Sequence, residues 1–522
     1  MNNIFRILLF FLLCAVLNSN YAEAQNIVKP DSALLVILNN IDGESLTLIE
    51  AQELALKNAS SVKTAEAMYK AALGTLRRER GFFDPEFYFN LTYRDMKEPT
   101  ASFFAGADVL ITEQTTSQTG LKLKLPTGTQ LELAVNTVSL KSNSQFAFLN
   151  PEYDAFGSLS LRQPLLGGFT YSGRKNLTVA EYEYESAKAL YEQELLAVNS
   201  VVEQMYWALF TAERDFAVQQ LTYNRAEAFL QETELRNKAG LVGPNQVANA
   251  KTFLAEQKII LIDREEQLDA QSDMITTLIG IRPGNNKTRF KVIDIPPSLF
   301  SVEPVEELIE QALNNNLELL AAKNEVESAN SLVNSAGWEL LPRVDLVGSL
   351  TSSGISGNPQ NVIFGSDTLR STTSGSFGDV LEQVYKRKFP GWSIGVELSM
   401  PIGLRPGLGE QDRLEAMAQS SEQKYIELTR ILEQQIRSAH RELSHGNNRL
   451  SAATEGVEAA QEQVRIGMIE FQNGRITAFE LVRLSEDFAV AQRRYSEALI
   501  KIVNAAATLK RLTSGIYTNK RN

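Results

Sequence analysis

The sequence predicts an α+β membrane protein whose chain consists of two internal repeats, each combining β-strands with a long antiparallel pair of helices. Three observations predict this fold class. Landmark residues recur in the same order in both halves, two long windows contain no proline, and several segments alternate apolar and polar residues. A repeat of this length exceeds the period of solenoid repeats and therefore indicates a duplicated half-protein.

The duplication is clearest at the start of each half. The segment that contains Ala55-Leu56-Lys57-Asn58 aligns with the segment that contains Ala312-Leu313-Asn314-Asn315, and with the same offset Pro85 falls on Pro342. Proline breaks a helix because it removes a hydrogen bond and clashes with the preceding turn. Pro85 and Pro342 are therefore predicted to mark the points where a helix changes to a strand.

Residues 1–24 are predicted to be an export signal. Arg6 supplies the positive charge, residues 7–17 form an apolar stretch too short for a transmembrane helix, and residues 22–24 provide an Ala-x-Ala cleavage site. Cys14 is the only cysteine and lies in the segment to be removed. We therefore expect a mature chain without disulfides, thiolate metal sites or a cysteine nucleophile.

Composition disfavours several functions. A formal net charge of −12 argues against binding to nucleic acid. No stretch after the signal has about eighteen consecutive apolar residues, so no membrane-spanning helix is predicted. An exported chain of this kind is expected to be periplasmic, secreted or a β-barrel.

Residues 172–239 and 407–473 are predicted to be nearly continuous helices, because both are rich in helix formers and lack proline. At about 1.5 Å per residue each would be roughly 100 Å long and would need partners. In both copies large apolar residues recur every seven positions with small residues between them, which is typical of closely packed coiled coils. The positions are Ile436, Leu443, Leu450, Val457, Val464 and Phe471 with Ala439, Gly446, Ala453, Ala460 and Gly467, and in the first copy Val202, Leu209, Phe216, Tyr223 and Leu230 with Ala212 and Ala226.

The strand segments alternate strictly between apolar and polar residues. They are 86–94, 118–125, 129–136, 158–163, 344–350 and 393–400. In an exported protein this alternation favours an outer-membrane β-barrel, although a soluble sandwich would show the same pattern. Long polar stretches are predicted to be external loops, and one short segment a periplasmic turn. The loops are 95–116, 137–157 and 352–390, and the turn is Pro126-Thr127-Gly128.

The strands are too few to close a barrel within one chain, because the smallest common closed barrels have about eight strands. We therefore expect several chains to close the barrel together; three chains would give at least twelve strands. The hairpin 118–136 has no counterpart in the second copy. It either folds over the rim, giving four strands per chain and twelve per trimer, or joins the wall, giving six and eighteen. We favour the wall, because its lysines can face the lumen while its leucines face lipid.

The helical patterns are interrupted at two places, residues 235–247 and 470–481. Gly240 and Gly474 are predicted to end one helix of each pair, and the polar residues after them to start the next. Before each long helix, Pro164 and Pro401 are predicted to be strand-to-helix switches.

No catalytic arrangement is visible. His440 and His445 are not at a spacing that shares a helix face well, no zinc motif frames them, and no Gly-Lys-Ser/Thr sequence forms a phosphate-binding loop. Acidic clusters are interpreted as solvated helix faces. We expect no enzyme activity, no metal and no cofactor.

Together these landmarks resemble the TolC-like outer membrane factor family, also called outer membrane efflux proteins, over about residues 46–515. The resemblance implies a homotrimer whose outer-membrane β-barrel is continued by a long antiparallel α-helical coiled-coil barrel in the periplasm. It implies a passive exit duct of a tripartite efflux or type I secretion system. The implied partners are a periplasmic adaptor (membrane fusion) protein, an inner-membrane pump or ABC exporter, and outer-membrane lipid, with no nucleic acid.

The resemblance also implies roles for the helix tips. By position, the tips dock the adaptor through Gly240, Leu241, Gly243, Gly474, Arg475, Ile476 and Thr477. The family often places two aspartates after the second tip glycine, where this chain has Glu480 and Arg483. Three copies of Glu480 would form an acidic constriction that favours cations. Alternatively, Arg483 pairs with Glu480 in a surface salt bridge and weakens the ring.

The expected organisation has six parts: the signal peptide, an N-terminal periplasmic segment, two repeats separated by a linker, and a tail. Their bounds are 1–24, 25–45, 46–283 (strands 82–163), 284–304, 305–515 (strands 343–400) and 516–522. An alternative of another class is an extracytoplasmic coiled-coil structural protein or adhesin with a β head. The export-channel hypothesis explains the paired proline switches and the two glycine-centred tips, which an adhesin would not need.

Overall fold

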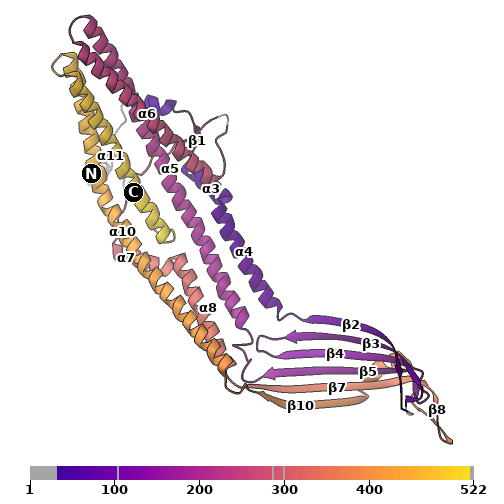
Figure 1. The fold of residues 1–522 in the computed structure, drawn as a ribbon. Helices are drawn as coiled ribbons and strands as arrows, with labels where there is room; N and C mark the ends of the chain where they lie inside the picture. Colours follow the sequence, from indigo (N-terminus) through magenta and orange to yellow (C-terminus); the bar gives the residue numbers. More distant parts are fainter. Residues whose placement is uncertain (1–31, 103–104, 285–286, 298–299, 518–522) are drawn as a thin grey trace, which may run out of the picture. The chain divides into compact units, whose positions relative to one another are not determined.

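The computed structural model describes residues 32–102, 105–284, 287–297 and 300–517, which divide into two compact units (Figure 1). The helical unit comprises the described parts of residues 1–67, 189–320 and 427–522, and the sheet unit those of 68–188 and 321–426. The predicted export signal and Cys14 lie outside the described residues. None of the helices in the described ranges is both long and apolar enough to cross a membrane.

The elements follow the order that the duplication predicts, with helices, strands and a long helical pair in each half. They are α2 (Ser32–Asn40), β1 (Glu44–Leu46), α3 (Leu48–Asn58), α4 (Ser60–Gly81), β2 (Glu86–Pro99), β3 (Val109–Lys124), β4 (Gln130–Ser142), β5 (Leu149–Pro164), α5 (Lys175–Lys238), α6 (Pro244–Ile279), β6 (Phe290–Val292), α7 (Val305–Asn315), α8 (Leu317–Glu339), β7 (Arg343–Pro359), β8 (Asn361–Phe364), β9 (Asp367–Arg370), α9 (Phe377–Tyr385), β10 (Phe389–Ser399), α10 (Arg405–Gln472) and α11 (Ala478–Leu512). Both predicted long helices, α5 and α10, are confirmed, and each contributes to both units.

The two repeats share a helix break and its contact. The first helix of each repeat stops at Asn58 or Asn315, and another helix starts within two residues. At each break an asparagine side chain donates to the last turn of the final helix of its repeat: Asn58 to the Ile279 carbonyl at 2.9 Å, and Asn316 to the Leu512 carbonyl at 3.0 Å. These bonds satisfy carbonyls that have no partner inside their helix.

The heptad seam of the second repeat is confirmed. The six large residues of the predicted seam, from Ile436 to Phe471, are all buried. The small residues permit close approach of α10 and α11, since a Cβ added to Gly446 would lie 2.9 Å from Cγ1 of Ile502, which is itself fully buried. Packing this tight leaves no room for a larger residue.

The seam of the first repeat is only partly buried. Val202 and Leu209 are buried, whereas Phe216 and Tyr223 are half-buried. Next to Val202 and Leu209 on the same face of α5, the Tyr206 hydroxyl donates to the Leu46 carbonyl of β1 at 2.9 Å, so this part of the seam also contacts β1.

A short parallel ladder joins β1 to β6 and was not predicted. It pairs Glu44 with Phe290 and Leu46 with Val292, one strand preceding the first repeat and the other following it. Two side chains of α5 hold the ladder. Glu213 accepts a hydrogen bond from the Val292 N–H at 2.8 Å, and the Tyr206 hydroxyl bonds Leu46.

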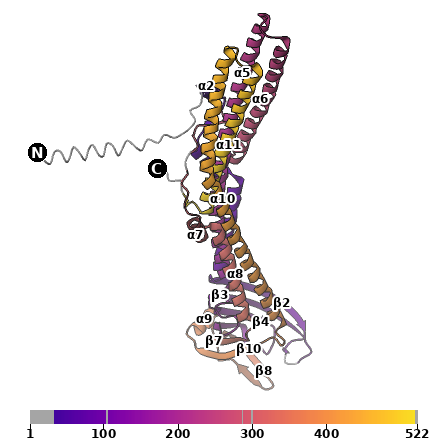
Figure 2. The ribbon, with the colours of Figure 1, turned by 90° about the vertical axis from the view of Figure 1, so that its left-hand side faces the viewer.

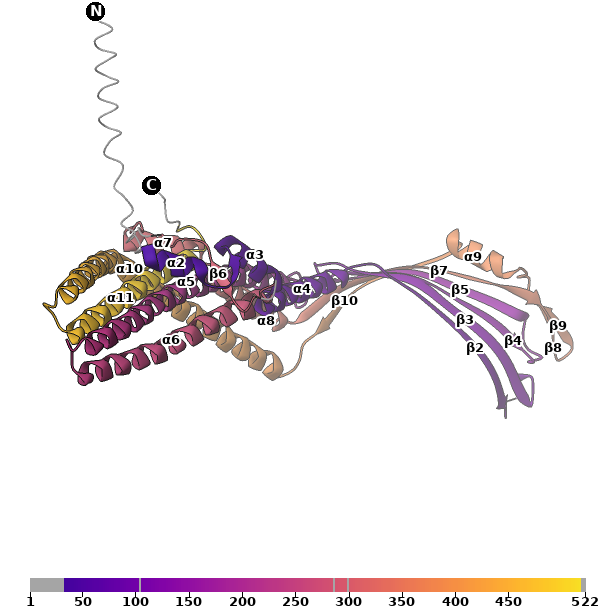
Figure 3. The same ribbon diagram turned by 90° about the horizontal axis from the view of Figure 1, so that it is seen from above.

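The sheet unit contains a six-stranded antiparallel sheet in the order β10-β7-β5-β4-β3-β2 (Figure 3). The hairpin 118–136 forms the inner ends of β3 and β4 and lies between β2 and β5. It therefore joins the sheet, as we favoured, rather than folding over a rim. Pro85 and Pro342 directly precede β2 and β7, and Pro164 is the last residue of β5. Pro401 follows the end of β10 and precedes α10.

The predicted loops are wrong in extent. Most of 95–116 and 137–157 is strand, since β2 and β3 are separated by 100–108 and β4 and β5 by 143–148. The segment 352–390 contains the end of β7, the β8–β9 hairpin, helix α9 and the start of β10. Serine and threonine lengthen the strands because pairing uses the backbone, and β-branched threonine fits a pleated sheet well.

One face of the sheet carries a continuous apolar row, and we call it the apolar face. In register, one residue from each strand lies side by side across all six strands, each at least 43% exposed: Phe87, Leu121, Leu133, Leu159, Leu350 and Trp392. The same face continues toward the strand ends that adjoin the long helices along the chain. Its further apolar residues there are Leu131, Leu161, Ile394, Val396 and Leu398. Such a surface is not expected to face water.

The opposite face is polar. Lys122 and Glu132 face each other on β3 and β4 with their charged atoms 3.9 Å apart. Arg162 bridges two carboxylates, that of Asp345 at 2.6 Å and that of Glu397 at 2.7 Å. The alternation predicted from the sequence is thus confirmed, with charges on one face and apolar residues on the other.

The α10–α11 contact generates a test. Replacing Gly446 with alanine should destabilise the protein, because overpacking costs roughly 1–3 kcal/mol and exceeds the roughly 0.5–1 kcal/mol gained in helix propensity. Gly456 in the same helix is the matched control, since a Cβ there meets no atom within 4 Å. Gly456→Ala should raise the thermal unfolding temperature, measured by loss of helical circular dichroism, and Gly446→Ala should lower it. Equal shifts would contradict the close approach at Gly446.

Candidate functional site at the helix tips

The candidate site is formed by the turns of the two long helical hairpins in the helical unit. Residues 239–243 connect α5 to α6, and residues 473–477 connect α10 to α11. Both turns lie at the same end of the helical unit (Figure 2), and one apolar cluster contains side chains from all four helices.

Both tips end their first helix with the same hydrogen-bond pattern. Gly240 and Gly474 have φ angles of 73° and 70°, a conformation that glycine adopts without strain and most other residues do not. Leu241 N–H donates to the Arg236 carbonyl at 2.9 Å, and Arg475 N–H donates to the Glu470 carbonyl at 2.8 Å. This is the Schellman arrangement, which satisfies the last carbonyls of a helix. The predicted helix ends at Gly240 and Gly474 are therefore confirmed.

The two tips start their second helix differently. Gly243 is the N-cap of α6 and has no side chain to bond the first turn, but Pro244 follows it at the first helical position. In the second tip Thr477 is the N-cap of α11, and its hydroxyl accepts from the Glu480 N–H. The Glu480 carboxylate accepts in return from the Thr477 N–H at 2.8 Å. These reciprocal bonds form a capping box.

The capping box sets the orientation of the Glu480 carboxylate and lowers its pKa. The carboxylate is turned back onto the first turn of α11, and the bond from the Thr477 backbone N–H, followed by that from the Thr477 hydroxyl, lowers the pKa of Glu480. No ion pair joins Glu480 to Arg483 among the described residues, although the charge of Arg483 also lowers the pKa of Glu480. The acidic ring and the salt bridge both stay predictions. Arg483 lies in a groove beside the tips.

An apolar cluster beneath the tips fastens the two hairpins to each other. Its buried members are Ala226, Phe229, Ala250, Phe253, Phe471 and Leu481, and Ile476 of the second turn packs against them. The guanidinium of Arg236 stacks over the Phe471 ring at 4.5 Å and bonds Glu232 at 2.7 Å. Arg236 thus places a positive charge at the C-terminal end of α10, where the helix dipole favours a cation.

The tips also expose large apolar side chains. Leu241 is 75% exposed, Phe479 is 72% exposed and Leu235 is 65% exposed. Beside them, α5, α6 and the start of α11 enclose a groove of ≈ 500 Å³ whose lining includes Phe253, Phe479 and Arg483. Leu235, Phe479 and the groove were not found from the sequence, although an apolar residue next to a glycine turn is a signal that could have suggested them.

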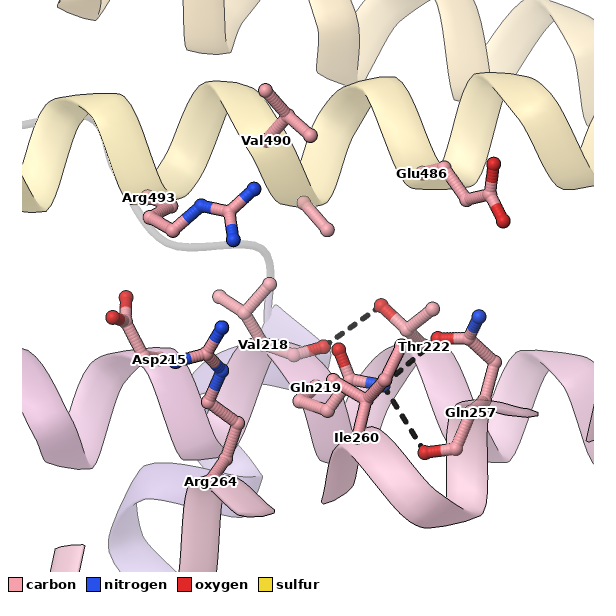
Figure 4. Close-up of a pocket in the computed structure, with 11 residues that line it drawn as sticks. Asp215, Val218, Gln219, Thr222, Gln257, Ile260, Arg264, Glu486, Val490 and Arg493 are labelled. Carbon is pink, nitrogen blue, oxygen red and sulfur yellow. Dashed lines mark hydrogen bonds between the residues drawn. The ribbon is translucent and has the colours of Figure 1, made fainter. Parts of the chain in front are cut away.

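A second, smaller groove of ≈ 280 Å³ lies further along α5, α6 and α11 (Figure 4). Gln219 of α5 donates to the Gln257 side chain at 2.8 Å across the groove. Asp215 lies beside Arg264 and Arg493 at the other end (Figure 4). Burial raises the pKa of Asp215 to about 6, although both arginines oppose this shift.

Among the residues that the structure describes, no three histidine, cysteine, aspartate or glutamate side chains come together in a way that could hold a metal ion. The tips offer exposed apolar residues and charged groups, which suit contact with another protein.

Glu213 makes the stability of the helical unit depend on pH. Burial, opposed by the bond from Val292 N–H, raises the pKa of its carboxyl to about 7 from 4.5. Because the folded pKa exceeds the unfolded pKa, this group favours folding fully below about pH 4.5, and the contribution is lost as pH rises through about 7. The loss amounts to roughly 3 kcal/mol.

We therefore expect Glu213→Gln, whose amide oxygen can still accept from Val292, to reduce the loss of stability between pH 5 and pH 8. Thermal unfolding at both pH values would measure it. The exposed Glu458 of α10 provides the control substitution Glu458→Gln, which should behave like the wild type. An unchanged pH dependence in Glu213→Gln would contradict the assignment.

Comparison with known proteins is informative at the level of family and fold. A model of the family described as outer membrane efflux protein matches residues 130–281 and 308–515, one segment in each repeat. No curated protein matches the sequence.

Three solved structures illustrate the likeness in fold. The Campylobacter jejuni CmeC outer membrane channel has 14% identity and a TM-score of 0.61, with 91% of this chain and 87% of that chain covered. The outer membrane protein VceC of Vibrio cholerae has 15% identity and a TM-score of 0.61, covering 90% and 96%. The Neisseria gonorrhoeae MtrE outer membrane channel has 16% identity and a TM-score of 0.60, covering 91% of each chain.

Proposed function

Because the chain belongs to the outer membrane efflux protein family, we propose that three copies of it form the passive exit duct of a tripartite efflux or type I secretion system. The protein is a channel of the outer membrane with a large helical part in the periplasm, and it is not an enzyme. Its fold is the predicted one, α+β with two repeats. The alternative of a coiled-coil fibre or adhesin does not fit this family.

The trimer is supported by the edges of the sheet. Strands β2 and β10 each have a partner on one side only within the described chain. An open sheet edge cannot lie in hydrocarbon, because its N–H and C=O groups would have no hydrogen-bond partners there. Pairing β10 of one chain with β2 of the next closes the sheet, and three chains of six strands each give an eighteen-stranded barrel.

The tips are proposed to dock a periplasmic adaptor protein, which in turn contacts an inner-membrane pump or ABC exporter. The single observation that carries this proposal is the identical glycine-ended turn in both repeats, with exposed apolar side chains beside it. The contact would use the two turns, namely Gly240, Leu241, Gly243, Gly474, Arg475, Ile476 and Thr477.

Glu480 and Arg483 remain the proposed entrance constriction. Because the carboxylate of Glu480 also caps α11, a movement of the first turn of α11 would move the constriction with it. Adaptor contacts at the adjacent turn would then bias the channel between closed and open arrangements.

Substitution of Gly474 tests the docking role. Valine at a φ of 70° is strained by roughly 1–2 kcal/mol, whereas asparagine tolerates this conformation, so Gly474→Val should distort the tip and Gly474→Asn should preserve it. A Cβ at Gly474 meets no atom within 4 Å, so neither variant should disturb packing. In cells lacking their own exit duct, dye accumulation should report lost export for the valine variant only.

Trimer formation on gels run without boiling is the control for both variants. Normal export by Gly474→Val, with the trimer intact, would refute the role assigned to this turn.

A further inference from the structure

Helix α9 lies on the apolar face of the sheet, against β5 and β7 (Figure 3). The face has small residues under the helix: a Cβ added to Gly157 would lie 2.6 Å from Cγ1 of Val384, and one added to Gly354 would lie 2.9 Å from the Val380 carbonyl oxygen. The Ser356 hydroxyl donates to the Ser376 carbonyl at 2.9 Å. The small side chains thus form a seat for α9 on the same face that carries the apolar row.

Helix α9 also covers part of the edge of β7. β10 begins opposite Ser353, so β7 continues beyond it without β10 as a partner. The Gln383 side chain takes the place of a strand there, accepting from the Ile355 N–H at 3.2 Å and donating to the Ile355 carbonyl at 3.3 Å. Helix α9 is therefore held in place by packing and by backbone bonds.

The side of α9 turned toward the sheet carries Val380 and Val384, and the Phe377 ring also packs there, 5.9 Å from the Tyr153 ring of β5 between centroids. Two further apolar residues, Leu381 and Tyr385, are exposed, and Tyr385 is 89% exposed. Nothing among the described residues covers Tyr385.

A basic segment follows α9 directly. Lys386, Arg387 and Lys388 are consecutive and exposed, and Arg387 has a φ of 50°, which turns the chain from α9 into β10. Lys386 pairs with Glu382, Lys388 lies over the Phe389 ring, and within the described ranges no ion pair joins Arg387 or Lys388 to a carboxylate. The segment therefore carries a net positive charge in a chain whose formal net charge is −12.

The position of the basic segment relative to the apolar row follows from the register. On β10 the exposed apolar residues of this face extend from Trp392, a member of the apolar row, to Leu398. On β2 they extend from Phe87, the member of the row on that strand, to Tyr93. Starting from the row, these two runs of apolar residues go in opposite directions. The apolar belt therefore crosses the strands obliquely, as expected for the tilted, staggered strands of a barrel. Lys388 lies four residues beyond Trp392, past the outer limit of the belt on its own strand.

From this arrangement we infer that α9 and the segment Lys386–Lys388 bind phosphate-bearing lipid headgroups of the outer leaflet, on the outside of the barrel. The inference rests on the proposed function, because it requires the apolar face to be the lipid-facing wall. Cations just beyond an apolar belt match anionic headgroups, and an exposed tyrosine beside them, here Tyr385, is typical of a membrane interface.

The test compares lipid binding by the purified full-length trimer and a variant with Lys386→Gln, Arg387→Gln and Lys388→Gln. Native mass spectrometry would measure retention of diphosphorylated lipid A, monophosphorylated lipid A and phosphatidylcholine. We expect the variant to bind diphosphorylated lipid A at least roughly tenfold more weakly than the wild type does. The affinity of the wild type for the three lipids should increase with their phosphate content.

The matched control removes the same charge from exposed lysines of the helical unit, with Lys63→Gln, Lys258→Gln and Lys501→Gln, and should bind like the wild type. Equal lipid A affinity in both variants would overturn the inference. So would displacement of lipid A by an equal concentration of inorganic phosphate, or dissociation of the Lys386–Lys388 variant alone into monomers, which would assign the segment to a subunit contact. A wild type that neither trimerises nor inserts into bilayers would instead refute the proposed function.

Discussion

The constraint on which the rest of this structure depends is that a backbone amide in hydrocarbon must find its hydrogen-bond partner within the protein. Each chain supplies a sheet with two open edges, β2 and β10, and an apolar face that spans all six strands. The apolar face makes water an unfavourable environment and the open edges make lipid unfavourable for a single chain. In the proposed trimer, closure by neighbouring chains would resolve both conflicts, and the charged opposite face would line a lumen. In this view the oligomer follows from the sheet rather than from any single interface residue.

The duplicated sequence forms two equivalent helical hairpins in the helical unit, and their tips differ in how the second helix is capped. Both tips end a helix on a glycine with positive φ and the same pair of backbone bonds. Only the second tip adds a side-chain capping box, between Thr477 and Glu480. The Phe471 side chain and the Arg236 stacked on it connect the end of α10 to α5. A force applied at either turn therefore acts on both hairpins, as a docking site that opens a channel requires.

The features that could be predicted from the sequence are those set by local periodicity. The seven-residue seam of α10 and the two-residue alternation of the strands depend only on helix and strand geometry, and both are present. Contacts between distant segments had no such signal: the β1–β6 ladder rests on three-residue strands, and the Tyr206 hydroxyl of α5 bonds Leu46 of β1, 160 residues away. Helix α9 and the role of Glu480 were missed despite readable cues, since Ser376 with Asp379 and Thr477 with Glu480 both have capping-box spacing. Serine and glycine around α9, and serine and threonine in the strand ends, made ordered segments resemble loops.

The most direct test of this account is the environment of the apolar face in a reconstituted bilayer. Single cysteines at Leu123 and Leu133, which lie on that face, can be compared with a cysteine at Ser160, which lies opposite Glu132 on the polar face. A lipid-soluble thiol reagent should label positions 123 and 133 while a water-soluble reagent does not, and the water-soluble reagent should label position 160 through the lumen. Ready labelling of positions 123 and 133 by the water-soluble reagent would place the β3–β4 hairpin outside the bilayer and contradict the six-stranded wall.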